Sequence, residues 1–160
     1  MTTETALLEI PASHTLPSTP ALMQRLVAEF DAVWVKNEQQ NAFLSMAGGC
    51  VLFIAGDPVR FPECLDVAVV LPELQRFFPS RFRIAVAERD SEDGLAKRYG
   101  VTRRPALVFL RDGQYVTTVS GMLDWDDYIK EVAQALALPT SRVPGIGIPV
   151  VSSTTGSSCH

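Results

Sequence analysis

The sequence predicts an α/β fold in which helices flank a central mixed β-sheet, and three observations support that class. The run CVLFIA at residues 50–55 is apolar without interruption, as in a strand covered on both faces. Strand-like and helix-like segments alternate along the chain up to Gly100. Two apolar runs then flank Asp112-Gly113, a strong signal for a tight hairpin of antiparallel strands.

The first half of the chain is expected to supply two helices and two strands. Thr19 is the expected cap of the first helix and Pro20 its first residue, because proline fits the first helical turn. The apolar face of this helix has helical spacing and comprises Leu22, Leu26, Val27 and Phe30. We expect a short strand at 32–35, and then a helix that Asn37 caps and that runs through Met46. The central strand follows.

The second half begins with a loop and a long helix at about 64–78. Pro72 predicts a kink in this helix, and Leu74, Phe77 and Phe78 are expected to pack inward. A strand at 81–87 precedes a helix at 91–99 with Ser91 as its cap. The hairpin comes next. Asp124 is then expected to cap a last helix with an apolar stripe at Tyr128, Ile129, Val132, Ala133 and Leu136.

Composition divides the chain into a polar N-terminal arm at 1–19, one domain at 20–138 and a flexible tail at 139–160 rich in Ser, Thr, Gly and Pro. The net charge is −4, with 14 basic and 18 acidic residues, and no basic stripe indicates nucleic acid. No apolar run is long enough to enter a membrane, and no secretory signal is visible. We therefore expect a cytoplasmic protein.

The cysteines and histidines predict neither a redox pair nor a metal site. Cys50, Cys64 and Cys159 include no C-x-x-C spacing, and His14 and His160 lie at opposite ends of the chain. The terminal Cys159-His160 pair supplies two ligands, fewer than the four of a closed structural site. The sequence predicts no cofactor.

A motif around Pro105 indicates one particular kind of α/β fold. Over about residues 33–138, the order of elements resembles the thioredoxin fold. The matching positions are Tyr99, Gly100, Val101, Pro105, Asp112, Gly113 and Gly121. The resemblance implies a cis bond before Pro105, with an ordinary trans bond as the alternative. A cis bond there leaves backbone groups free to pair with an extended peptide.

The redox centre of thioredoxins is missing. Its place after the central strand is taken by the loop at 56–62, which contains no cysteine. Cys64 follows alone, whereas dithiol exchange needs a nucleophile and a resolving cysteine. We therefore expect the peptide groove without the chemistry.

Three segments resemble the hydrogenase-1 operon protein family (HyaE, HupG and HoxO type). They are VLFIAGDPVRFPE at 51–63, RFRIAVA at 81–87 and RYGVTRRPALVFLRDGQYVTTVSGMLDW at 98–125. The resemblance implies a non-enzymatic chaperone of NiFe-hydrogenase maturation. It would bind the iron–sulfur small subunit, its twin-arginine signal peptide, or both, before export. Other maturation proteins are further possible partners, and an acidic chain suits a basic signal peptide.

The candidate partner-binding residues follow the groove and the loop. They are Asp57, Pro58, Arg60, Arg103, Arg104, Pro105 and Gly121. The acids Glu88, Asp90, Glu92 and Asp93 either receive a pair of arginines or simply complement a helix dipole. Two other functions stay open: a thiol redox protein that uses Cys64, and a generic protein-interaction module.

Overall fold

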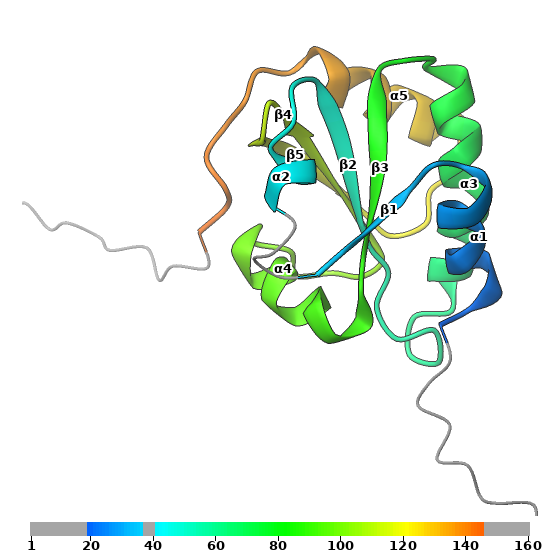
Figure 1. The fold of residues 1–160 in the computed structure, drawn as a ribbon. Helices are drawn as coiled ribbons and strands as arrows, with labels where there is room; N and C mark the ends of the chain where they lie inside the picture. Colours follow the sequence, from blue (N-terminus) through cyan, green and yellow to red (C-terminus); the bar gives the residue numbers. More distant parts are fainter. Residues whose placement is uncertain (1–18, 37–40, 146–160) are drawn as a thin grey trace, which may run out of the picture.

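The structure, a computed structural model, describes residues 19–36 and 41–145. Within these residues, five strands form one sheet in the order β1-β3-β2-β4-β5 (Figure 1). The strands are β1 (Val33–Val35), β2 (Gly49–Ile54), β3 (Phe82–Ala87), β4 (Ala106–Arg111) and β5 (Gln114–Ser120). β3 runs parallel to β1 and β2, whereas β4 is antiparallel to β2 and β5. The predicted mixed sheet is confirmed.

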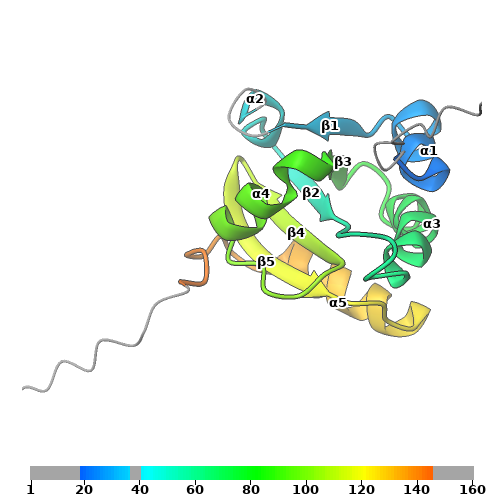
Figure 2. The same ribbon diagram turned by 90° about the horizontal axis from the view of Figure 1, so that it is seen from below.

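Helices cover both faces of the sheet, as Figure 2 shows from below. They are α1 (Ala21–Glu29), α2 (Asn41–Leu44), α3 (Glu63–Phe77), α4 (Glu92–Arg98) and α5 (Trp125–Ala137), with a short 3-10 turn (Arg89–Ser91) before α4. α1, α3 and α5 pack on one face, and α2 and α4 pack on the other. No helix among the described residues is both long and apolar enough to cross a bilayer.

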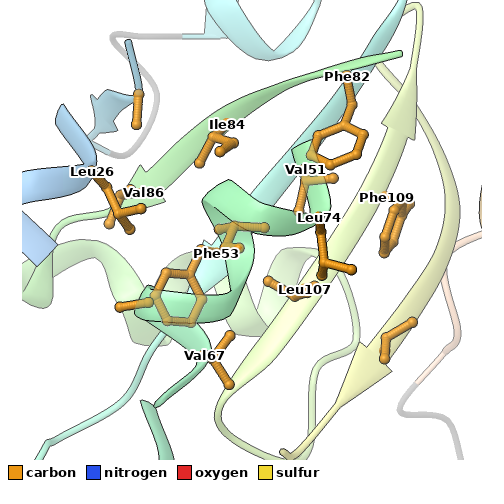
Figure 3. Close-up of a cluster of buried hydrophobic side chains, with 14 of the residues drawn as sticks. Leu26, Val51, Phe53, Val67, Leu74, Phe82, Ile84, Val86, Leu107 and Phe109 are labelled. Atoms are coloured by element: carbon orange, nitrogen blue, oxygen red, sulfur yellow. The ribbon is translucent and has the colours of Figure 1, made fainter. Parts of the chain in front are cut away.

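β2 lies at the centre of the sheet because both of its faces are apolar. Val51 and Phe53 enter the cluster under α1, α3 and α5, whereas Leu52 and Ile54 enter the cluster under α2 and α4. Figure 3 shows the first cluster, whose labelled members are Leu26, Val51, Phe53, Val67, Leu74, Phe82, Ile84, Val86, Leu107 and Phe109. The uninterrupted apolar run is therefore a central strand that is buried on both faces, as the sequence predicts.

Three expected details of the helices are wrong. Pro20 rather than Thr19 occupies the N-cap position of α1, because its ψ of 141° is extended and not helical. Phe77 is 55% exposed at the end of α3. In α5 the inward face includes Ala135 and leaves Ala133 exposed, because Tyr128, Val132 and Ala135 share the buried side of the helix.

The other caps and turns follow the sequence more closely. Ser91 and Asp124 stand at the N-cap positions of α4 and α5, although neither side chain makes a capping hydrogen bond. The hairpin turns at Asp112 and Gly113, whose φ angles of 53° and 78° suit a two-residue turn. The second helix covers only Asn41–Leu44, and its expected cap, Asn37, lies outside the described residues.

The segment that follows α5, residues 139–145, contacts the domain. The Ser141 backbone N–H donates to the Tyr115 carbonyl oxygen at 2.7 Å, and the Ser141 hydroxyl donates to the Val116 carbonyl oxygen at 2.9 Å. Val143 packs against the cluster under α2 and α4. At Gly100, where φ is 65°, a Cβ atom would collide with the Pro144 carbonyl oxygen. The predicted tail therefore begins with seven residues that include contacts to β5 and to the end of α4.

Candidate functional site

The candidate site lies where the end of β2 meets the start of β4. These strands are antiparallel, and Ile54 pairs with Ala106, so the loop after β2 faces the turn before β4 (Figure 1). The loop and the turn approach each other closely. A Cβ atom at Gly56 would lie 2.7 Å from Cδ2 of Phe61 and 3.1 Å from Cβ of Arg104. Only glycine fits here, because its φ of 83° is also unfavourable for other residues.

An open groove of about 420 Å³ runs between this loop and this turn. We call it the proline groove. Its lining residues are Arg60, Phe61, Val101, Thr102, Arg103 and Arg104. Another pocket, of about 230 Å³, lies at the opposite end of β2 and β4 and contains none of the predicted site residues.

The turn at the proline groove has two parts. Hydrogen bonds hold Pro105 and Gly121 in place, whereas the backbone of residues 102–104 makes none to other described residues. The Arg104–Pro105 peptide bond is cis, which confirms the sequence prediction. Pro105 is buried, and its carbonyl oxygen accepts the Gly121 N–H at 2.8 Å. The Gly121 carbonyl oxygen in turn accepts the Tyr128 hydroxyl at 2.9 Å. By contrast, the backbone groups of residues 102–104 make no hydrogen bond to another described residue.

Asp57 and Pro58 lie in the loop but outside the lining of the proline groove. The Asp57 carboxylate accepts the Val59 N–H at 2.9 Å and lies 3.9 Å from a guanidinium nitrogen of Arg89. Its backbone carbonyl oxygen accepts the Phe61 N–H at 2.7 Å. Asp57 therefore shapes its own loop. Of the seven candidate residues, three arginines line the groove, and Pro105 and Gly121 form the base behind the turn.

A buried carboxylate, Glu92, holds the loop from behind. Its side chain is 3% exposed, and its two oxygens accept the Gly56 N–H at 3.2 Å and a guanidinium N–H of Arg89 at 3.2 Å. Burial raises the pKa of Glu92, while Arg89 and the Gly56 hydrogen bond act in the opposite direction. The sequence alone predicts that Glu92 is one of several solvent-exposed acids. The missed signal is its helical spacing with the buried Leu95 and Ala96.

Two further acids of this run pair with basic residues of the chain. Asp93 lies 2.7 Å from Arg104, and Glu88 lies 3.8 Å from Lys36. Three of the four acids that were candidates for receiving two arginines therefore already face basic or backbone groups of their own chain.

Cys64 lies in the first turn of α3 and is fully buried, with an exposed fraction of 0%. Burial raises the pKa of its thiol to about 11, and the nearby Glu92 charge acts in the same direction. At neutral pH the thiol is protonated and out of contact with solvent, whereas the thiolate is the reactive form. Cys50 is likewise buried, and the described residues contain no group of three or more potential metal ligands.

The raised pKa of Cys64 predicts a specific loss of stability at high pH. In the unfolded chain the thiol ionises near its ordinary pKa of 9.0, and in the folded chain only near 11. The stability that the buried, neutral Cys64 thiol contributes is therefore fully present below pH 9 and is lost as the pH rises through 11. Two pKa units correspond to about 2–3 kcal/mol. Urea unfolding of the wild type should show this loss between pH 9 and 11, and Cys64→Ser should show a smaller loss, because burial also raises the pKa of Cys50 to about 11 and that thiol contributes in the same way. Equal slopes would contradict the burial of this thiol.

Comparisons with known proteins agree with this architecture. A family model described as "Hydrogenase-1 expression protein HyaE" matches residues 22–128. The chain is 57% identical over 162 residues to the hydrogenase expression/formation protein HoxO of Cupriavidus necator, with 100% of both chains covered. It is 46% identical over 110 residues to HoxO of Azotobacter vinelandii, covering 68% of this chain and 72% of that one.

The solved structures include a variant thioredoxin from Halobacterium salinarum. It matches with a TM-score of 0.51 and 23% identity, over 71% of this chain and 94% of the thioredoxin. That similarity shows a thioredoxin-like fold. Combined with the match over residues 22–128, it gives both the fold and the family: the chain belongs to the HyaE family of hydrogenase expression proteins, which supports a role in hydrogenase maturation.

Proposed function

We propose that the protein is a non-catalytic accessory protein of NiFe-hydrogenase maturation. It binds the precursor of the iron–sulfur small subunit, including its twin-arginine signal peptide, in the cytoplasm before export. The observation that carries this proposal is an open proline groove beside a loop without cysteine. The family relationship supports the process, since the relatives are named hydrogenase expression/formation proteins.

The chemistry around the proline groove supports binding rather than catalysis. The neighbouring thiol, Cys64, is buried and has a raised pKa. The carboxylate of Glu92 is enclosed behind the loop and bonded to Gly56 and Arg89. Neither group reaches a ligand in the groove, whereas the backbone groups of residues 102–104 are free to pair with an extended segment.

A thiol redox protein that uses Cys64 is the second candidate, and its test is direct. We expect no reduction of insulin by the full chain, and no change when Cys64 is replaced by serine, because this thiol is buried and forms no disulfide with another cysteine of the described residues. Insulin reduction at a thioredoxin-like rate, lost in Cys64→Ser, would establish the redox function instead.

The proposed partner is tested by capture. The affinity-tagged full chain is mixed with small-subunit precursor, with precursor that lacks the signal peptide, and with an unrelated twin-arginine precursor. We expect retention of the hydrogenase precursor and little retention of the unrelated one. Loss of binding after removal of the signal peptide assigns the main contact to that peptide, and retained binding assigns it to the rest of the subunit. Failure to retain either form of the subunit contradicts the proposal.

A further inference from the structure

The proline groove has a charge opposite to that of the whole chain. The sequence carries a net charge of −4. Of the six residues that line the groove, however, three are arginines and none is acidic. A local excess of one sign selects partners of the other sign and repels like charges.

Two of the three guanidinium groups have no counter-charge among residues 19–36 and 41–145. Arg60 and Arg103 are exposed, and neither forms an ion pair with another described residue. The guanidinium of Arg60 lies 5.5 Å from the centre of the Phe61 ring. This stacking keeps the side chain at the groove and leaves its N–H donors available. The side chain of Arg103 lies beside Gly121, at 3.8 Å from where a Cβ atom would stand.

The third guanidinium, that of Arg104, pairs with one exposed acid. Arg104 lies 2.7 Å from Asp93, whose side chain is 92% exposed, so water screens this pair. The acids behind the loop are engaged elsewhere. Asp57 faces Val59 and Arg89, and Glu92 faces Gly56 and Arg89. No carboxylate other than Asp93 contacts the three arginines within the described residues.

The backbone of the groove indicates the conformation of its ligand. Free backbone donors and acceptors at residues 102–104 suit an extended strand, which presents alternate side chains to one side. Carboxylates on that side would meet Arg103 and Arg104 on one wall and Arg60 on the other.

We infer that the proline groove binds an extended acidic segment of the small-subunit precursor and excludes the paired arginines of its signal peptide. This inference rests on the proposed function, because it takes the precursor as the partner. It reverses the expectation that an acidic chain offers this groove to a basic peptide. The arginine pair must then be bound outside the groove.

Short blocked peptides test the sign of the groove independently of the precursor. In the probe, valine alternates with glutamate, and two matched peptides carry glutamine or lysine in place of glutamate. We expect the full chain to bind the glutamate peptide at least about tenfold more tightly than either matched peptide, and less tightly as salt increases. Equal binding of the three peptides, or preference for lysine, would overturn the inference.

Charge reversal then locates the binding site. Arg60→Glu and Arg103→Glu should each weaken binding of the glutamate peptide by about tenfold. Arg76→Glu makes the same change of charge on α3, outside the groove, and should leave binding within about twofold of wild type. Because all three side chains are exposed, folding should persist, which thermal unfolding checks. Equal sensitivity of the three variants would mean that net charge, not the groove, controls binding.

Capture of the precursor by wild type and groove variants distinguishes failure of the acidic-segment inference from failure of the proposed function. If the groove variants still capture precursor as well as wild type and the peptides show no preference, the acidic-segment inference is wrong and the proposed function stands. If neither the wild type nor any variant captures precursor, the proposed partner is wrong. The peptide preference then shows by itself whether the groove binds acidic segments.

Discussion

Gly56→Ala is expected to destabilise the protein by about 2–5 kcal/mol and to abolish binding in the proline groove. The φ of 83° costs an alanine about 1–2 kcal/mol relative to glycine. The added Cβ would also lie 2.7 Å from Phe61 and 3.1 Å from Arg104, so both side chains must move. Such overpacking costs about 1–3 kcal/mol more. Chemical unfolding measures the first effect, and peptide and precursor binding measure the second.

Gly113→Ala is the matched control for this substitution. Gly113 also has a positive φ, 78°, and its added Cβ would lie 2.9 Å from Cα of Ser45. It stands in the hairpin turn, at the other end of β4 from Pro105. We expect a similar loss of stability with unchanged binding. If both variants lose binding in proportion to stability, the loop around Gly56 has no special part in recognition.

Ending the chain after Leu138 is expected to lower the free energy of unfolding by about 2–3 kcal/mol. The truncation removes both Ser141 hydrogen bonds, worth about 0.5–1.5 kcal/mol each, and the packing of Val143. The melting temperature should fall by about 5–10 °C. This result would place the C-terminal boundary of the domain beyond Leu138.

A second chain that ends at Gly145 isolates the cause. It keeps every contact described for residues 139–145, so the difference in stability between the two truncated chains belongs to these residues alone. Ser141→Ala in the full chain removes only the hydroxyl bond to Val116 and should give a smaller loss. Identical melting temperatures for the chains that end at Leu138 and Gly145 would show that the segment adds no stability.

The sheet could be predicted because its strongest signals are local. An uninterrupted apolar run identified β2, and Asp112-Gly113 identified the β4–β5 hairpin, since turn chemistry and burial act on neighbouring residues. The place of the proline groove needed the resemblance to a known fold. Its two walls are about forty residues apart, and only the pairing of β2 with β4 brings them together.

The electrostatics of the site could not be predicted from the sequence. Glu92 belongs to an acidic run, and the Gly56 N–H that its buried carboxylate accepts comes from a segment 36 residues earlier in the chain. The overall charge of −4 likewise concealed the basic groove, because charge in sequence says little about its distribution in space. The contacts of Ser141 were hidden for another reason. A Ser/Thr/Gly/Pro composition is typical of a tail, although individual hydrogen bonds can hold its first residues.

The position of Ser141 also bears on the exposed edge of the sheet. β5 is an outermost strand of the sheet, and an exposed strand edge invites pairing with another molecule. The backbone N–H and hydroxyl of Ser141 occupy the carbonyl oxygens of Tyr115 and Val116 along that edge. The opposite outermost strand, β1, has only three residues and offers a short template. Because two acceptors of this edge strand are already engaged within the chain, β5 offers fewer backbone groups for pairing with another molecule.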